Sequence, residues 1–277
     1  MQSRVGKVGP PSKLLWAREV VAMAELGAFI AARPWWRLAQ RGDGHPVWVL
    51  PGLAQSDLST RPLRSFLANR GYIACPWGLG LNTGSSRLLD EHLLPRLHAL
   101  HEQHGRKVSI VGWSMGGLFA RALARMAPAA VRQVITLGSP FMGDRKASNA
   151  WRLYEAMSGD RAGDPEIAER FQMQLPVPTT SIYSRRDGIV AWQGCLNDAC
   201  PQAENIEVVS SHLGLGHHPA VLYAIADRLA QPEGNWQAFD QKRRARWLYP
   251  VRIASGHAHH RDPPRARSIP QPGVRSV

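Results

Sequence analysis

Residues 108–124 read VSIVGWSMGGLFARALA, and this stretch decides the fold. Its first part contains Val108, Ile110 and Val111, and a run of apolar and β-branched residues predicts a buried strand. From residue 118 onward, apolar residues recur at helical spacing. The segment Gly112-Trp113-Ser114-Met115-Gly116 lies between the two patterns. A Gly-x-Ser-x-Gly sequence between a strand and a helix is typical of a nucleophile elbow.

Glycines stand two residues before and two residues after Ser114, as such a turn requires. A serine on a sharp turn between strand and helix adopts an unfavourable backbone geometry, which only small neighbours permit. Gly112 and Gly116 supply that room, and Gly117 lets the helix lie close to the sheet. We therefore predict Ser114 as a nucleophile, with Gly112 and Gly116 as the glycines of the elbow.

A serine nucleophile needs a base and an acid, because an unactivated hydroxyl attacks poorly. Residues 179–190, TTSIYSRRDGIV, read as a strand that opens into a loop carrying Asp187. Residues 205–216, NIEVVSSHLGLG, read as the next strand, and a glycine-rich loop holds His212. Loops that follow successive parallel strands meet at one edge of the sheet, where ligands bind. The sequence therefore predicts a catalytic triad of Ser114, Asp187 and His212.

Other acids and histidines are weaker candidates. The alternative acids lie in polar stretches without a strand, where a solvated carboxylate is the usual interpretation: Asp144, Asp160, Asp164 and Asp198. His217 and His218 are alternative bases, but they abut Pro219 and are expected to cap the final helix, residues 219–229. His98, His101 and His104 share one helical segment with no cysteine or carboxylate cluster beside it, so no metal site is predicted.

An oxyanion hole completes such a site. Its first donor is expected to be the backbone N–H of Met115, the residue after the serine. The second is expected in the loop that follows a short buried strand at 47–50, where Gly52 lets backbone amides approach a ligand closely. The N–H of Leu53 is the candidate, and that of Ala54 is the alternative.

The motifs VWVLPGL, GWSMGG, SRRDGIV and SHLGLG occur in this order within residues 44–229. In this respect the chain resembles serine esterases and lipases of the α/β-hydrolase superfamily, in the style of compact bacterial lipases and related lipid hydrolases. The resemblance implies a mostly parallel, doubly wound α/β sheet flanked by helices, a small helical lid, and an acyl-enzyme mechanism without a cofactor. Many relatives have His-Gly where this chain has Pro51-Gly52. The first two strands that are usual in the larger superfamily have no counterpart before residue 45, so a sheet of about six strands is expected.

The expected organisation is an N-terminal helical extension (1–44), a hydrolase domain (45–230) and a basic, disordered tail (231–277). Residues 140–178 are expected to form the lid, because this stretch suggests two short helices and no strand. Its apolar residues suit an acyl chain, although ordinary packing is the alternative. A glycine-rich loop, residues 77–86, is a second candidate for lining the site.

The charge of the chain is uneven. Of the formal net charge of +13, residues 241–277 contribute nine Lys or Arg against one Asp. Such a tail attracts anionic lipid or nucleic acid, but no nucleic-acid-binding motif accompanies it, so no nucleic-acid partner is predicted. Residues 13–32 read as an amphipathic helix that either packs on the hydrolase body or lies on a lipid surface.

The three cysteines, Cys75, Cys195 and Cys200, are expected to be free thiols. The apolar run at residues 20–32 is interrupted by Glu25 and lacks a cleavage site, so neither a secretory signal nor a spanning helix is predicted. A cytoplasmic or membrane-peripheral protein is expected. The predicted activity is hydrolysis of lipid-like carboxylic esters. The alternatives are an acyltransferase, a thioesterase, or a non-catalytic protein that binds lipid or a partner on the same scaffold.

Overall fold

The computed structural model describes residues 8–144, 146–165, 171–172, 174–240 and 249–250. In this part of the chain a six-stranded sheet has the order β2-β1-β3-β4-β5-β6, and every neighbouring pair is parallel. The strands are β1 (Pro46–Leu50), β2 (Ile73–Cys75), β3 (Val108–Trp113), β4 (Val131–Leu137), β5 (Thr179–Ser184) and β6 (Ala203–Val208). This confirms the predicted sheet of about six strands.

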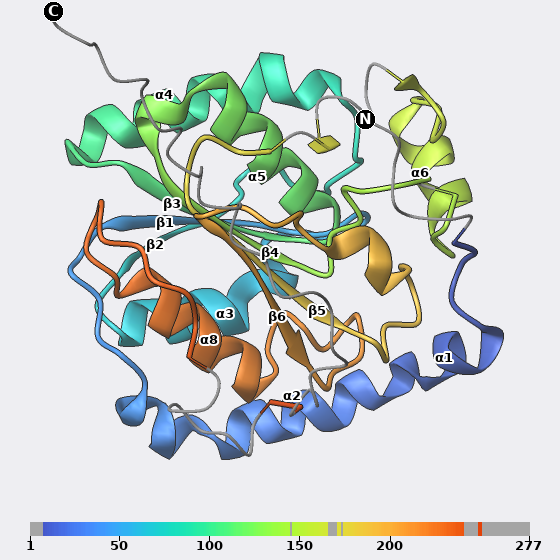
Figure 1. Ribbon diagram of the computed structural model, residues 1–277, viewed down its shortest axis with the longest axis horizontal. Coiled ribbons are helices and arrows are strands. Elements are labelled where there is room, and N and C mark those ends of the chain that lie inside the picture. The colour runs from blue at the N-terminus through green and yellow to red at the C-terminus, as the bar shows by residue number, and fades with distance from the viewer. Residues whose placement is uncertain (1–7, 145, 166–170, 173, 241–248, 251–277) are drawn as a thin grey trace, which may run out of the picture.

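Helices cover both faces of the sheet (Figure 1). One face carries α3 (Asp57–Asn69) and α8 (Pro219–Leu229), and the other carries α4 (Leu94–His104) and α5 (Met115–Met126). Residues of β1 alternate between the two cores: Val47 packs with the α3 and α8 side, and Trp48 packs with the α4 and α5 side. Burial on both faces explains why the strands read as nearly continuous apolar runs.

The remaining helical elements are short. They are α1 (Lys13–Ala17), η1 (Arg18–Val21), α2 (Ala22–Ala31), η2 (Arg33–Leu38), the π-helix η3 (Leu89–Leu93), η4 (Pro128–Ala130), α6 (Trp151–Ser158) and η5 (Trp192–Cys195). The predicted helix at residues 13–32 is present as α1, η1 and α2 in succession, and it forms an outer layer beyond α8 (Figure 1). Phe29 and Trp36 attach this extension to the body, where the rings of Trp36 and Phe66 lie 5.3 Å apart.

Two predicted regions differ from the structure or lie partly outside it. The first of the two helices predicted for a lid is present as α6, while most of the segment predicted for the second falls outside the described residues. The tail predicted from residue 231 was expected to be disordered, and this is wrong for Phe239 and Tyr249, which are buried. Their rings lie 5.1 Å apart, and Tyr249 Oη donates to the carbonyl of Ala220 at 2.9 Å. Burial of two aromatic rings outweighs the polar composition around them.

The carboxyl ends of the strands lie at one edge of the sheet. From β1 the chain adds β2 on one side and then returns to add β3 to β6 on the other, so the direction of winding reverses between β1 and β3. Ligands of open α/β sheets bind outside the carboxyl ends of the strands at such a reversal. The loops after β1, β3, β4, β5 and β6 are therefore the place to look for a site.

All three cysteines are unpaired, as predicted.

Gly116 provides a test of the tight contact between α5 and β1. A Cβ atom on Gly116 would lie 2.3 Å from the carbonyl oxygen of Leu50, whereas one on Gly27 in α2 would meet nothing within 4 Å. We expect Gly116→Ala to lower the free energy of unfolding by about 1–3 kcal/mol or more through overpacking. As the matched control, Gly27→Ala should raise it by up to about 1 kcal/mol through helix propensity. Urea unfolding measures both, and equal effects of the two substitutions would contradict this packing.

Candidate active site

Ser114 lies at the turn between β3 and α5. Its backbone φ is +51° and its ψ is −116°, a conformation that residues with a side chain rarely adopt. The turn is held by the N–H of Ser114, which donates to the carbonyl of Leu137 at 2.8 Å. A Cβ on Gly112 would lie 2.4 Å from the carbonyl oxygen of Gly116, so both positions require glycine. The backbone geometry expected of a nucleophile elbow is therefore present.

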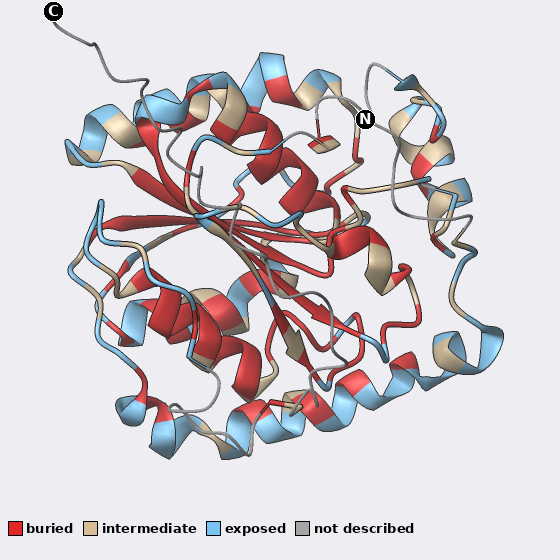
Figure 2. Ribbon diagram, in the orientation of Figure 1, coloured by how far each residue is buried: buried red, intermediate tan, exposed pale blue. Residues whose placement is uncertain are grey.

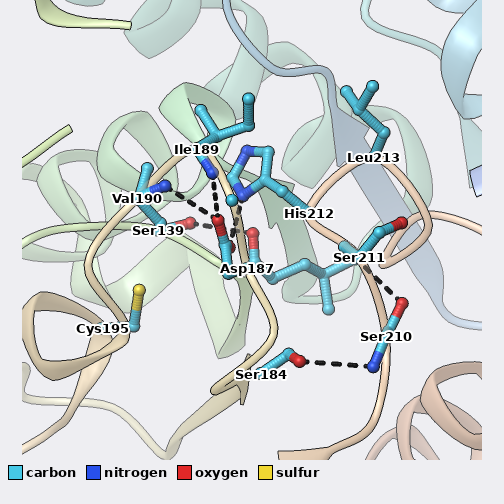
Figure 3. Close-up of polar contacts among 12 residues, drawn as sticks. Ser139, Ser184, Asp187, Ile189, Val190, Cys195, Ser210, Ser211, His212 and Leu213 are labelled. Carbon is cyan, nitrogen blue, oxygen red and sulfur yellow. Dashed lines mark hydrogen bonds and ion pairs between the residues drawn. The ribbon is translucent and has the colours of Figure 1, made fainter. Parts of the chain in front are cut away.

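Asp187 and His212 form a buried pair (Figure 3). Asp187 Oδ2 lies 2.6 Å from His212 Nδ1, and each residue follows the strand from which it was predicted, β5 or β6. The other oxygen, Oδ1, accepts the N–H groups of Ile189 and Val190, both at 2.8 Å. Both carboxylate oxygens are thus fixed, and the acid that meets the histidine is Asp187.

The electrostatic surroundings of His212 favour the protonated imidazole more than the surroundings of a histidine exposed to water do. Burial by itself lowers the pKa of His212, but the charge of Asp187 and its hydrogen bond act in the opposite direction. The negative charge of Glu19 adds to the effect of Asp187, and the pKa of His212 lies above its usual value of 6.5. An imidazole in this setting is suited to accept a proton.

Gly138 brings this pair against the elbow. Its φ is +55°, and a Cβ on it would lie 3.1 Å from His212 Nδ1 and 3.2 Å from Asp187 Oδ2. The indole N–H of Trp113, beside Ser114, donates to the carbonyl of His212 at 3.1 Å. Within the described residues the Ser114 hydroxyl has no hydrogen-bond partner. The structure therefore joins acid and base directly and brings them against Trp113 and Gly138, next to the elbow, and within the described residues no hydrogen bond joins Ser114 and His212.

Two backbone N–H groups near Ser114 are unoccupied. In the part of the chain that the structure describes, the N–H groups of Leu53 and Met115 have no acceptor. The alternative donor Ala54 is engaged, because its N–H donates to the carbonyl of Asn82 at 2.8 Å. Both predicted donors are therefore available to an oxyanion, and Ala54 is not.

Asn82 holds the loop that carries Leu53. Its side-chain amide donates to the carbonyl of Pro51 at 2.8 Å, and its backbone N–H donates to the carbonyl of Gln55 at 2.8 Å. Asn82 is fully buried. It belongs to the loop at 77–86, which was predicted to line the site. The loop at 77–86 instead supports the loop that carries Leu53. No residue of the loop at 77–86 lines the pocket described next.

A small pocket with a volume of about 50 Å³ lies beside Ser114 and is partly open to solvent. Among the residues that the structure describes, no charged side chain lines it. The lining residues are Leu53, Ser114, Met115, Leu118, Pro140, Ser148, Ala150, Trp151, Tyr154, Ala162 and Val190. Trp151 and Tyr154 belong to α6, so the predicted lid helix contributes to the pocket. An apolar wall around a serine suits a hydrocarbon chain.

Two glutamates of the N-terminal extension, Glu19 and Glu25, hold the acid and base loops. Glu19 Oε1 accepts the N–H of Gly188 at 2.8 Å and that of His212 at 3.0 Å, and Glu19 Oε2 accepts the N–H of Leu213 at 2.9 Å. Glu25 accepts the N–H of Ser211 at 3.0 Å and also its hydroxyl. Both glutamates are buried. This role was not predicted from the sequence, although an acid such as Glu25 within the apolar run 20–32 is an unusual pattern that signals a buried partner.

The alternative bases have other roles. His217 Nε2 lies 3.1 Å from the carbonyl oxygen of Ala22, and His218 Nδ1 accepts the N–H of Ala220 at the start of α8. His218 therefore caps the final helix, as predicted. His98, His101 and His104 lie on the helix α4. Within the described residues, no three His, Cys, Asp or Glu side chains lie close enough together to hold a metal ion.

A second cluster of aspartate, histidine and serine lies at the opposite, amino ends of the strands. His45 Nδ1 lies 2.5 Å from Asp43 Oδ1, and His45 Nε2 lies 2.8 Å from Ser109 Oγ. Both His45 and Ser109 are completely buried, and burial lowers the pKa of His45 to about 4 despite the hydrogen bond to Asp43. Because no substrate can reach Ser109, this cluster is structural.

Comparison with known proteins supports the same fold. Residues 89–185 match the palmitoyl protein thioesterase family, a stretch that includes Ser114 and ends before Asp187 and His212. No curated protein sequence matches the chain.

Among solved structures, lipase B of Aspergillus fumigatus is similar with a TM-score of 0.56 and 18% identity, over 68% of this chain and 52% of that one. This chain therefore spans about half of that lipase. A metagenome-derived lipolytic enzyme matches with a TM-score of 0.50 and 15% identity, over 69% of this chain and 93% of that one. The chain has the α/β-hydrolase fold, and the two similar structures named here are lipolytic enzymes.

The charge of Glu19 should be measurable at His212. We expect Glu19→Gln to lower the pKa of His212, because the substitution removes a negative charge that favours the imidazolium. Glu25→Gln is the matched control: it alters the same extension, but Glu25 holds Ser211 and should leave that pKa nearly unchanged. NMR titration of the imidazole resonances measures both. A pKa that does not fall in Glu19→Gln, or that falls equally in both variants, would contradict the assigned role.

Proposed function

We propose that this protein is a serine hydrolase that cleaves carboxylic esters with lipid-like acyl chains. One observation carries the proposal: Ser114 sits on a strained elbow and lines an uncharged, apolar pocket. Two further observations support it. Acid and base are paired beside the elbow, and the N–H groups of Leu53 and Met115 are free to bind an oxyanion.

In the proposed mechanism, Ser114 Oγ attacks the acyl carbonyl carbon while His212 Nε2 takes the hydroxyl proton. Asp187 holds Nδ1 of His212, which fixes the tautomer and stabilises the imidazolium. The negative charge on the carbonyl oxygen is bound by the N–H groups of Leu53 and Met115, each worth about 3 kcal/mol of transition-state stabilisation.

The intermediate then collapses, and His212 gives its proton to the departing alcohol. The acyl group is now esterified to Ser114. Water attacks this ester while His212 takes a proton from the water, and the proton passes to Ser114 Oγ as the carboxylic acid leaves. The pair His212 and Asp187 thus ends each cycle in its starting state.

A thioester is the second candidate substrate, because residues 89–185 match the palmitoyl protein thioesterase family. The same steps apply with a thiol as leaving group. Acyl transfer to an alcohol is the alternative reaction that the sequence offers. A cytoplasmic or membrane-peripheral location stays a prediction from the sequence. A purely binding protein would have no use for a strained serine beside a buried acid and base.

An active-site-directed probe tests the assignment of the nucleophile. We expect a fluorophosphonate to label the parent protein at one residue, Ser114, and Ser114→Ala to abolish both labelling and ester hydrolysis. His212→Ala should lower the rate of hydrolysis by about a thousandfold or more. Ser109→Ala is the control, because it removes the serine of the buried cluster and should leave labelling intact. Intact mass and peptide mapping locate the adduct, and undiminished hydrolysis by folded Ser114→Ala would refute the proposal.

The length of the acyl chain tests the pocket. Ala150 lines the pocket and is only partly buried, so a larger side chain can enter without disturbing the core. We expect Ala150→Phe to lower kcat/KM for p-nitrophenyl palmitate by about tenfold or more and to spare p-nitrophenyl acetate. Ala99→Phe on the exposed side of α4 is the matched control. Equal loss for the two esters would argue against an acyl chain in this pocket.

A further inference from the structure

The outer side of the N-terminal helical segment carries no charged residue along α2. Between residues 20 and 32, every exposed residue is apolar or glycine. The largest are Val20, Met23 and Ile30, whose exposed fractions are 73%, 71% and 57%. Figure 2 shows the segment as an exposed outer layer with buried positions on its inner side.

This distribution is the reverse of that in an ordinary surface helix, which turns charged residues outward. Glu25 is the one charged residue in the run, and Glu19 precedes it. Both point inward and are bound by backbone N–H groups of the acid and base loops. The acidic side chains of the extension thus bind the body of the protein, while its apolar side chains face outward. Exposed apolar patches of this kind mark interaction sites.

Positive charges stand at both ends of the apolar stretch. Lys13 and Arg18 precede it, and Arg33, Arg37 and Arg41 follow it, all of them exposed. Within the described residues up to Gly42, no acidic side chain is exposed. The surface is therefore apolar in its centre and cationic at its ends.

Two tryptophans flank the same surface. Trp16 in α1 is 58% exposed and Trp35 in η2 is 61% exposed. Indole rings are enriched at the interface between membrane and water, because one end of the ring system is apolar and the other donates a hydrogen bond.

We propose that residues 14–41 form a docking surface for an anionic phospholipid bilayer, with the helical segment lying in the plane of the membrane interface. In this arrangement Val20, Met23 and Ile30 enter the boundary of headgroups and acyl chains, and the arginines at the ends meet lipid phosphates. Among the described helices, none is long and apolar enough to cross a bilayer.

Charge favours the bilayer over a second copy of the chain. In a two-fold symmetric dimer the same patch meets itself, and here both of its ends are cationic. Cationic ends would then face cationic ends in either orientation, which costs binding energy. An anionic lipid surface complements both ends at once.

The surface begins next to the pocket. Ser148 and Ala150 line the pocket, and Asn149 between them donates a hydrogen bond to the carbonyl of Pro11 at 3.1 Å. Docking through the segment therefore holds the pocket and the loops clamped by Glu19 near the lipid. This consequence rests on the proposed function, whereas the lipid contact itself does not.

Vesicle co-sedimentation of the full chain tests the proposal. We expect the parent to bind vesicles of phosphatidylcholine mixed with phosphatidylglycerol much more tightly than vesicles of phosphatidylcholine alone. The double variant Met23→Glu/Ile30→Glu should bind the mixed vesicles about tenfold more weakly or worse. The matched control is Leu58→Glu/Met126→Glu, which changes two exposed apolar residues elsewhere and should bind like the parent.

The cationic ends are tested separately. We expect Arg33→Gln and Arg37→Gln each to weaken binding to the mixed vesicles by about fivefold, and added salt to weaken binding of the parent. Binding of these variants to phosphatidylcholine alone should be unchanged. Circular dichroism confirms that each variant is folded.

Three outcomes would overturn the proposal. The first is binding of Met23→Glu/Ile30→Glu equal to that of the parent, which would assign the contact to another part of the chain. The second is a parent that binds neither kind of vesicle. The third is a parent dimer that this double variant dissociates without any vesicle binding. If neither the parent nor any variant hydrolyses esters, the proposed function is refuted, and the result of the vesicle experiment still stands.

Discussion

The close approach of α5 to β3 and β1 is the constraint on which the site depends. Ser114 can keep its strained backbone only because positions 112 and 116 are glycines. The surrounding backbone leaves no room for a Cβ at either position. The N–H of Met115 is free because it lies in the first turn of α5, where no carbonyl of the helix can reach it. The turn at Ser114 thus combines a strained serine with a free donor one residue later.

The other half of the site depends on charge. The loops after β5 and β6 present backbone N–H groups that the sheet cannot satisfy, and carboxylates supply the acceptors: Asp187 for Ile189 and Val190, and Glu19 for Gly188 and His212. A buried carboxylate is tolerated only when such donors surround it. The loops are ordered and the carboxylates are stabilised by the same bonds.

What the sequence predicted correctly has a local signal. The six-stranded parallel sheet follows from apolar runs between helical patterns, and Asp187 and His212 meet because each comes directly after a strand. The parts it missed join distant segments. Glu25 read as an interruption of an apolar run, and Asn82 read as one residue of a glycine-rich loop, since no spacing along the chain reveals a partner far away. Phe239 and Tyr249 were assigned to a disordered tail because the basic composition around them hides an aromatic pair that packs in the core.

The hydrogen bonds of Glu19 also bear on how the protein folds. They link residues 169 to 194 positions apart along the chain, so they are among its longest-range contacts. During synthesis the N-terminal segment leaves the ribosome first, and its two acids then have no partners until the loops after β5 and β6 have emerged. Contacts of such high order form late, because a long loop of chain must close before they contribute. The acid and base loops are therefore secured late in folding, when the N-terminal segment meets the loops after β5 and β6.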